Sequence, residues 1–428
     1  MKRIFLTAIT TSLVSIIMDA EAQSLFNVVG NTTVKVKSSE ILTIQGGLSN
    51  ASGGVIDNDG TIYVSGDWSN DNPAGGLSPN SGTVELNGNI TQTIGGTQPT
   101  TFNNLTCNGQ GSDKKLGVNT TVGGTTGILS IGSDAFDLNG YTLTVTNPSP
   151  SAVSAGSGYM KSETLPPSYS RLTWNTGSNN GTYVIPFGSG AGGSDLLMSM
   201  GTSGASGNGS IGFATFPTTA LNTPLPSGVN VQPGQQEDIA DRFWIIDPQG
   251  FSVNPAFSNL TFTYNDPTDI DLTDNPGMVE ADLQAVRYNA NSGLWLDWGP
   301  SGTANTAGNT VTVASVNPSD FHPIWGLAEK TVSTRIGEKP NQSYGIANAT
   351  SQVHTGNLHI SFNTPTEGLC SITLYDVVGH QVAEKMTNAS AGINQVQFPL
   401  SQLGQAMYLA VLRNEKNQVS TRKVVISR

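Results

Sequence analysis

Apolar and polar residues alternate with a period of two in short runs along most of the chain. Examples are 60–70, 82–89 and 138–145, which combine a strand-length alternating run with Gly-Thr, Asn or Asn-Gly residues at its ends. This period is typical of half-buried β-strands, and the Gly and Asn residues predict tight turns between them. We therefore expect an all-β protein made of many short strands.

The repeated unit in residues 23–150 has the parts of one rung of a parallel β-solenoid: a short strand of period two and a turn. The spacing between units is irregular, with 22 positions between Gly60 and Gly82 and more afterwards. We predict a β-solenoid-like repeat domain here. A sandwich built from hairpins is the alternative.

Longer strands and more aromatic residues characterise residues 151–330. The alternating segments include 172–174, 181–188, 242–246, 260–264, 286–288 and 294–298. Such strands are typical of a β-sandwich, with Trp174, Trp244 and Trp325 in its core. The polar segment 331–343, which contains Pro340, is predicted to be a linker.

Residues 344–428 again show short alternating strands separated by Gly- and Asn-containing turns, which predicts a small Ig-like β-sandwich. Several short motifs lie within this segment. Their positions are Leu374, Tyr375, Asp376 and Gly379, then Gly392, then Leu403 and Tyr408, and finally Lys423, Val424 and Val425.

The order of these motifs resembles the C-terminal sorting domain of the bacterial type IX secretion system. The chain departs from the family pattern at residues 347–349, where Pro-Asn-Pro is usual, and at Ala406, where Gly is usual. The resemblance implies that the segment is recognised by the type IX secretion machinery, and that the cargo is released or attached to surface glycolipid. An Ig-like end domain without a sorting role is the alternative.

The N-terminus has the parts of a secretory signal peptide. Lys2 and Arg3 precede an apolar run over 4–18, and Ala20-Glu21-Ala22 is a small-x-small cleavage site. We predict a signal peptide at 1–22 and a mature chain that begins at Gln23. The run is short for a hydrocarbon core of about 30 Å, so we expect no integral membrane protein, with a retained anchor as the alternative. The predicted location is the outer cell surface or the extracellular space, reached through the periplasm.

Charge is unevenly distributed. The net charge is −12, and residues 23–332 hold 9 Lys and Arg against 24 Asp and Glu. An acidic body repels nucleic acid and anionic lipid headgroups. We therefore expect no nucleic-acid partner.

The sequence offers few groups for catalysis. Of the four histidines, only His322 lies in the body, which is too few for a Ser-His-Asp triad or a His-based metal site. Residues 207–212 match the dinucleotide pattern G-x-G-x-x-G, but a strand is expected after it where a helix is needed. Cys107 and Cys370 fall in different predicted domains and are expected to be separate thiols. We expect no cofactor.

Acidic residues supply the remaining candidates. A glycosidase or lyase site would draw on paired carboxylates, and the turn at Asp57 and Asp59 departs from a calcium loop. An acidic loop with a candidate calcium site lies at 266–274, with a solvated loop as the default. The carboxylate candidates are Glu237, Asp238 and Asp241, and Glu280 with Asp282; the loop residues are Asp266, Asp269, Asp271 and Asp274.

Trp295 and Trp298 are the candidates for stacking on sugar rings. They are three positions apart, so in a regular strand they point to opposite faces, which places one in the core and one outside.

Taken together, the sequence predicts a multidomain, non-catalytic protein that is adhesive or structural in the cell envelope. A glycan-binding module that takes an extracellular glycan is the first alternative, and a polysaccharide-degrading enzyme the second.

Overall fold

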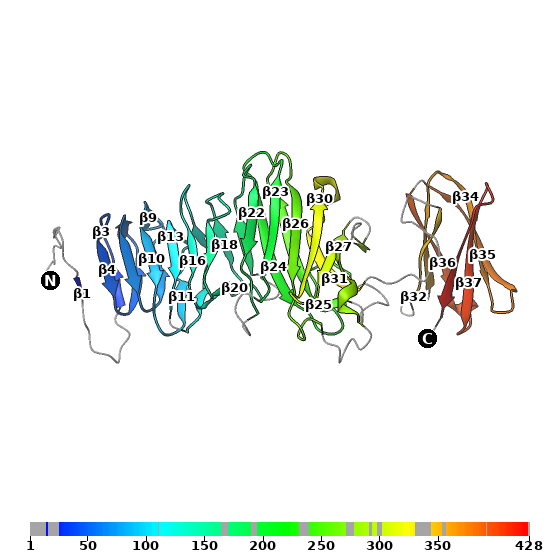
Figure 1. Ribbon diagram of the computed structural model, residues 1–428, viewed down its shortest axis with the longest axis horizontal. Helices are drawn as coiled ribbons and strands as arrows, with labels where there is room; N and C mark the ends of the chain where they lie inside the picture. The colour runs from blue at the N-terminus through cyan, green and yellow to red at the C-terminus, as the bar shows by residue number, and fades with distance from the viewer. Residues whose placement is uncertain are drawn as a thin grey trace. The chain divides into compact units, whose positions relative to one another are not determined.

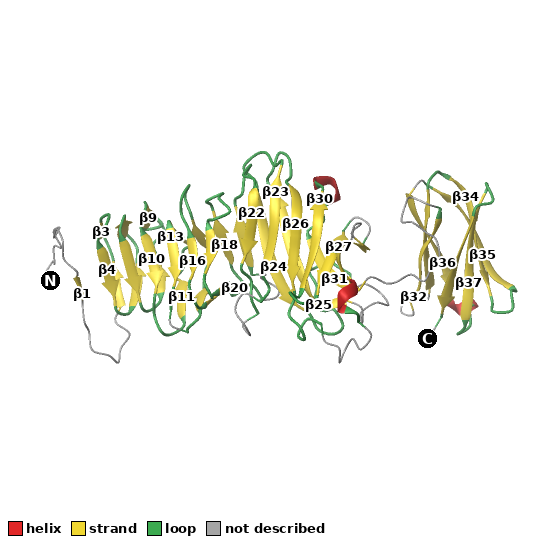
Figure 2. Ribbon diagram, in the orientation of Figure 1, coloured by secondary structure: helices red, strands yellow, loops and turns green. Residues whose placement is uncertain are grey.

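The computed structural model describes residues 14–15, 25–109, 111–163, 170–189, 195–230, 239–270, 278–290, 293–297, 302–329, 344–352, 357–390 and 392–426. The chain divides into two compact units, residues 1–331 and 332–428. Almost all of the regular structure is strand (Figure 2). Apart from Val14–Ser15 (β1), the predicted signal peptide lies outside the described residues, as does the whole predicted linker 331–343.

The N-terminal part of the first unit is a parallel β-solenoid (Figure 1). Within the described residues it has six rungs, each of which gives one strand to each of three stacks, and two further strands continue the second and third stacks. The first stack contains β4 (Ile41–Ile44), β7 (Thr61–Val64), β10 (Thr83–Leu86), β13 (Asn104–Cys107), β16 (Leu129–Ile131) and β19 (Val153–Ala155). The second contains β2 (Leu25–Val28), β5 (Gly47–Asn50), β8 (Trp68–Asn70), β11 (Gln92–Gly95), β14 (Lys114–Leu116), β17 (Ala135–Asp137) and β20 (Tyr159–Lys161). The third begins with β3 (Thr33–Val36), β6 (Val55–Asn58) and β9 (Leu77–Pro79), and β12 (Thr100–Phe102), β15 (Thr120–Val122), β18 (Thr142–Val145) and β21 (Arg171–Trp174) follow.

Neighbouring rungs pair in parallel and in register, so residues of the same kind stack in columns. One column contains Ile62, Val84, Leu105 and Leu129, all at most 2% exposed. Burying apolar surface between rungs supplies the stability that one rung lacks alone. The predicted solenoid is confirmed, and the hairpin-based alternative is wrong because the strand pairs are parallel.

The glycines that precede β7 and β10 have no room for a side chain. A Cβ at Gly60 would lie 2.5 Å from the Lys37 carbonyl oxygen of the rung below, and one at Gly82 would lie 2.5 Å from the Asn58 carbonyl oxygen. Only a residue without a side chain permits this approach.

Beyond the rungs, the third stack continues into an antiparallel sheet. Its order is β12-β15-β18-β21-β24-β25-β31-β27-β28, and the pairing changes from parallel to antiparallel between β21 and β24. The added strands are β24 (Ser210–Pro217), β25 (Ile239–Gln249), β31 (Ile324–Glu329), β27 (Leu283–Asn289) and β28 (Leu294–Asp297). Strand β24 begins at Ser210, inside residues 207–212, and continues to Pro217, so a strand follows the glycine pattern as the sequence predicted.

A second, five-stranded sheet packs against this one. It contains β22 (Gly181–Ile185), β23 (Met198–Ser203), β26 (Ala256–Thr263), β30 (Thr310–Val316) and β29 (Thr303–Asn305). Phe262 of β26 lies between Trp244 and Trp325, with ring centroids 5.3 and 5.6 Å apart. These two tryptophans and Trp174 are fully buried, as predicted.

The solenoid and the central sheets share one hydrophobic core, which runs from Val28 to Leu327. Parallel pairing extends to β21, past residue 150. Separate folding of residues 23–150 and 151–330 therefore stays a prediction.

The second unit is built from two antiparallel sheets around its own core. One contains β32 (Gly345–Gln352), β33 (Asn357–Thr364) and β36 (Gly392–Pro399), and the other β35 (Gln381–Ala389), β34 (Gly368–Tyr375), β37 (Met407–Asn414) and β38 (Val419–Val425). Short 3-10 helices occur at η2 (Glu280–Asp282) and η3 (Pro318–Asp320) in the first unit and at η4 (Leu400–Gln402) in the second.

Candidate functional site

The motif at residues 374–379 forms the turn between β34 and β35. Leu374 is fully buried, while the Asp376 Oδ1 atom accepts hydrogen bonds from the backbone N–H groups of Val378 (3.0 Å) and His380 (2.8 Å). The bond from His380 is the main reason why the pKa of Asp376 is below its usual value. Gly379 has φ +87°, a conformation that favours glycine. Leu374 therefore anchors this turn in the core, and Asp376 and Gly379 fix its backbone.

The other motif positions also fix turns and core contacts of the second unit. Asn394, two residues after Gly392, donates a hydrogen bond to the Ser390 carbonyl oxygen (2.7 Å) and accepts one from the Ser390 N–H (2.9 Å). Tyr408 is 6% exposed and donates its hydroxyl hydrogen to the Gly404 carbonyl oxygen (3.1 Å). Leu403 and Val424 are buried in the same core.

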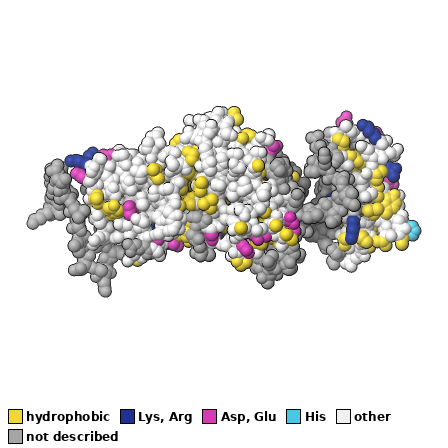
Figure 3. Space-filling model, in the orientation of Figure 1, with side chains coloured by type: hydrophobic (Ala, Val, Ile, Leu, Met, Phe, Trp, Pro, Cys, Tyr) yellow, Lys and Arg dark blue, Asp and Glu magenta, His cyan; other side chains and the backbone are white. Residues whose placement is uncertain are grey.

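Some motif residues point away from this core. Tyr375 pairs with Leu409, which pairs with Lys423 on the next strand, and Met407 pairs with Val425. Leu409, Met407 and Val425 are 43%, 42% and 59% exposed. Figure 3 shows hydrophobic side chains gathered on the visible face of the second unit. The strands that carry the motif therefore contribute both core residues and an exposed apolar surface in this unit.

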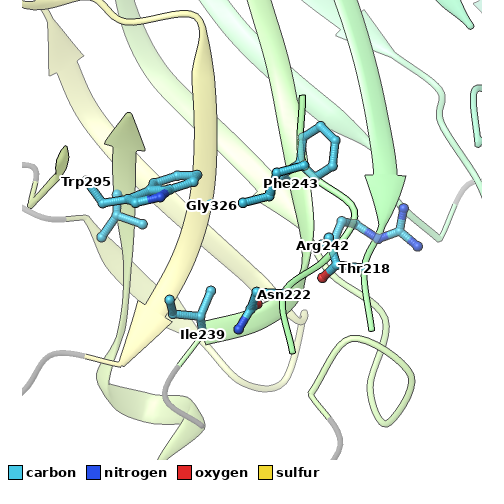
Figure 4. Close-up of a pocket in the computed structure, with 9 residues that line it drawn as sticks. Thr218, Asn222, Ile239, Arg242, Phe243, Trp295 and Gly326 are labelled. Carbon is cyan, nitrogen blue, oxygen red and sulfur yellow. The ribbon is translucent and has the colours of Figure 1, made fainter. Parts of the chain in front are cut away.

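In the first unit, a pocket opens beside Trp295 (Figure 4). Its cavity volume is about 20 Å³, which is room for roughly one water molecule. The residues that line it are Thr218, Asn222, Leu225, Ile239, Arg242, Phe243, Val286, Trp295 and Gly326.

Trp295 is held in place on the wall of this pocket. Its indole N–H donates to the Asn230 carbonyl oxygen (2.8 Å), and its ring meets Tyr288 edge to face with centroids 5.6 Å apart. The ring lies beside Gly326 of β31, where an added Cβ would be in ordinary van der Waals contact with it at 3.4 Å. Trp295 is half-buried, and Trp298 lies outside the described residues.

Arg242, on another wall, is 1% exposed and connects separate parts of the chain. Its Nε atom donates to Asp269 Oδ2 (2.8 Å), Nη2 to Glu163 Oε1 (3.0 Å) and Nη1 to Thr215 Oγ1 (3.3 Å). Burial raises the pKa of both carboxyls, and the attraction of Arg242 opposes that rise. The guanidinium charge of Arg242 is therefore paired with carboxyl groups inside the protein.

The acidic loop at 266–274 is only partly described. Asp269 is fully buried, and its Oδ2 atom also accepts a hydrogen bond from the Asn265 N–H (2.8 Å). Asp271 and Asp274 lie outside the described residues, so the calcium site stays a prediction. Within the ranges that the structure describes, no group of three or more His, Cys, Asp or Glu residues is placed to hold a metal ion.

The carboxylate candidates are not brought together as one described site. Glu237 and Asp238 lie outside the described residues, and Asp241 is 5% exposed in β25. Glu280 and Asp282 share η2, where Glu280 accepts a hydrogen bond from the Tyr264 hydroxyl. Cys107 and Cys370 are buried free thiols, as expected, and burial raises the pKa of Cys107 to about 12.

Sequence reasoning missed a buried lysine inside the solenoid. Lys114 is fully buried, and its Nζ atom donates to the carbonyl oxygens of Gly88 (3.0 Å) and Ser112 (2.7 Å), with Asp134 Oδ2 at 3.9 Å. The signal was present: Leu116 points inward, so alternation places Lys114, two positions earlier, on the same side.

Residues 354–427 match the family model of the secretion system C-terminal sorting domain. The chain carries a type IX sorting domain. Such a domain engages the type IX secretion machinery and directs its cargo to the cell surface or the extracellular space. Among the described segments, no helix has the length and apolar character needed to cross a membrane.

No curated protein matches the chain. Among solved structures, a β-glucuronidase from Ruminococcus gnavus is 13% identical over 51% of this chain and 35% of its own, with a TM-score of 0.15. A pullulanase of Group B Streptococcus is 14% identical over 40% of this chain and 21% of its own, with a TM-score of 0.13. An endonuclease/exonuclease/phosphatase from Beutenbergia cavernae is 8% identical over 60% and 91%, with a TM-score of 0.18. The chain spans about a third of the length of the first of these, and TM-scores this low carry no argument about function.

Proposed function

We propose that this type IX cargo is an adhesive or structural protein of the cell surface, and that its body acts by contact rather than by catalysis. The sorting domain delivers the body, and the outer faces of the solenoid supply the contact surface.

The observation that carries the proposal is a row of threonines on the outside of the solenoid. Thr101, Thr121, Thr144 and Thr173 are mutual partners on four successive parallel strands. Their side chains are exposed or half-buried. Strands in a sheet are about 4.8 Å apart, so the hydroxyl groups repeat at that interval on a rigid surface.

Such a row suits a partner that is itself extended and repetitive. Each hydroxyl group offers one donor and two acceptor positions, and single contacts of this kind are weak. Many weak contacts on one rigid scaffold add through effective concentration. Arg242 and Lys114 donate their hydrogen bonds to groups inside the protein, which also supports a structural role for the buried charges of the body.

Adhesion of beads coated with the full chain to polysaccharide and cell surfaces tests this proposal. The double variant Thr101→Lys/Thr144→Lys places bulky charges in the row, and we expect adhesion to fall about tenfold because several contacts are lost together. The matched control, Thr182→Lys/Thr310→Lys, changes one exposed and one half-buried threonine of the other sheet. Equal adhesion of the two variants, or release of sugar from the polymer, would contradict the proposal.

The second candidate is a glycan-binding module, favoured by the pocket beside Trp295. The exposed part of the indole ring is suited to stacking on the apolar face of a sugar ring. Trp295→Ala should then abolish binding on a glycan array, while Tyr63→Ala, which changes a half-buried aromatic residue outside the pocket, should leave it unchanged. Binding that survives Trp295→Ala would exclude this pocket as the sugar site.

A further inference from the structure

The first rung of the solenoid ends in an uncovered apolar layer. Phe26, Val34 and Leu42 continue the inward columns of Leu48, Ile56 and Ile62 on the second rung. The second-rung residues are at most 1% exposed, whereas those of the first rung are only half-buried. Leu25, Val29 and Ile41 lie around them and are 62%, 45% and 43% exposed. A solenoid that ends in solvent normally carries a polar capping repeat at this place.

The backbone at the same end is also open. Within the described residues, β2 pairs only with β5, and β3 pairs only with β6. Strand β4 pairs with β7 on one side and, on the other, with the two residues of β1, through Val14 with Leu42 and Ser15 with Thr43. The contact with β1 shows that this edge accepts an added strand.

The opposite end of the solenoid is covered by the chain itself. Strand β21 continues into the antiparallel strand β24, and β20 is bridged at Met160 to Phe187. The last inward residues there, Val153, Met160 and Trp174, are at most 7% exposed. A head-to-tail stack is therefore blocked, and the first rung is left as the open end.

We propose that the first rung, residues 25–44, is a docking surface for the first rung of a second copy of this chain, so that the mature protein is a head-to-head dimer. In the predicted mature form only Gln23 and Ser24 precede β2, which is too short a segment to form a cap. The edge that β1 occupies in the full chain is then free for the partner.

A two-fold axis across this end fits both the backbone and the charges. It places the edge strands of the two copies antiparallel, which extends the sheets with ordinary hydrogen bonds, and it closes the assembly at two copies. Lys35, Lys37 and Glu40 are the charged residues of 25–44, giving a net charge of +1, while residues 23–332 as a whole carry −15. The segment that meets in this arrangement carries none of the net negative charge of the body, so it does not add to the repulsion between two acidic bodies.

The test is the molar mass of the chain from Gln23 to Arg428, measured by light scattering over about a hundredfold range of concentration. All buried apolar core residues lie at or beyond Val28, so this form keeps the core. We expect a dimer. Leu25→Lys, which adds charge to the edge, should raise the dissociation constant at least about tenfold.

Leu221→Lys is the matched control, because Leu221 is also 62% exposed and lies away from the solenoid end. It should leave the dimer unchanged. Hydrogen exchange supplies a second measurement: the amides of β2, β3 and β4 should be more protected in the unchanged chain than in Leu25→Lys, at equal thermal stability. A monomer at every concentration, or a dimer that Leu25→Lys weakens no more than Leu221→Lys does, would overturn the proposal.

Discussion

The Nε atom of Arg242 lies 2.8 Å from Asp269 Oδ2, and both side chains are 1% exposed. Removing one partner of a buried ion pair leaves the other charge without compensation, which typically costs about 3–5 kcal/mol. We expect Arg242→Met to lower the free energy of unfolding of the first unit by about this amount. Urea unfolding measures it.

Arg171→Met is the control for that experiment. Arg171 pairs with Asp247 at 3.3 Å, but their side chains are 34% and 19% exposed. Exposed pairs are worth less than about 1 kcal/mol, so this variant should stay close to the unchanged protein. Similar losses for the two variants would contradict the structural role assigned to Arg242.

Glu163 gives a prediction about pH. Burial raises its pKa above the ordinary value of 4.5. A carboxyl whose folded pKa is raised holds its proton more tightly in the folded state, so stability falls as the pH rises from the unfolded pKa through the folded one. Glu163→Gln removes this titration. Its stability relative to the unchanged protein should therefore increase as the pH rises from 4.5 towards neutrality, and a pH series of unfolding curves measures the difference. A difference that is constant with pH would contradict the assignment.

Lys114 and Lys115 are neighbours in sequence with opposite environments. Lys114 is fully buried beside Asp134, whereas Lys115 lies on the outer side of β14. Lys114→Met leaves the Asp134 carboxylate buried without a cation, at a cost of about 3 kcal/mol, and Lys115→Met should cost less than about 1 kcal/mol. Thermal unfolding of the two variants provides the comparison. An equal effect would show that the Lys114 ammonium group is not needed.

Gly60 and Gly95 represent two kinds of glycine in the solenoid. Gly60 has no room for a side chain, whereas Gly95 has. A methyl group at Gly60 would press against backbone, with the Lys37 carbonyl oxygen 2.5 Å away, while the nearest atom to one at Gly95 is 3.6 Å away. Gly60→Ala should destabilise the solenoid by about 1–3 kcal/mol or more, because backbone atoms would have to move. Gly95→Ala should leave the stability almost unchanged. Calorimetry of both variants measures the two losses, and a larger loss for Gly95→Ala than for Gly60→Ala would contradict this prediction.

Alternation along single strands predicted much of this fold. It placed Trp174, Trp244 and Trp325 in the core and indicated a solenoid, because these properties depend on residues close in sequence. The regularity of the rungs was hidden, since partners lie 20 to 29 positions apart, as Ile41 with Thr61 and Leu143 with Leu172. Loops of different length vary this spacing.

The groups around the pocket could not be predicted in the same way. Arg242 meets Glu163 across 79 positions and Asp269 across 27. Glu163 follows β20 and Asp269 lies in a turn, so these pairs form only when segments far apart in the sequence come together around β25. No local pattern records them. The sorting motifs were easier to find, because each turn contains its own hydrogen-bonding partners, as Asp376 does with Val378 and His380.

The most direct test of the account is the fraction of the protein that external protease digests on intact cells, with and without residues 344–428. The type IX sorting domain should be required for delivery, so the full chain should be accessible outside the cell, and the truncated chain should stay inside as a folded first unit. Equal exposure of the truncated chain on the cell surface would contradict delivery by this domain.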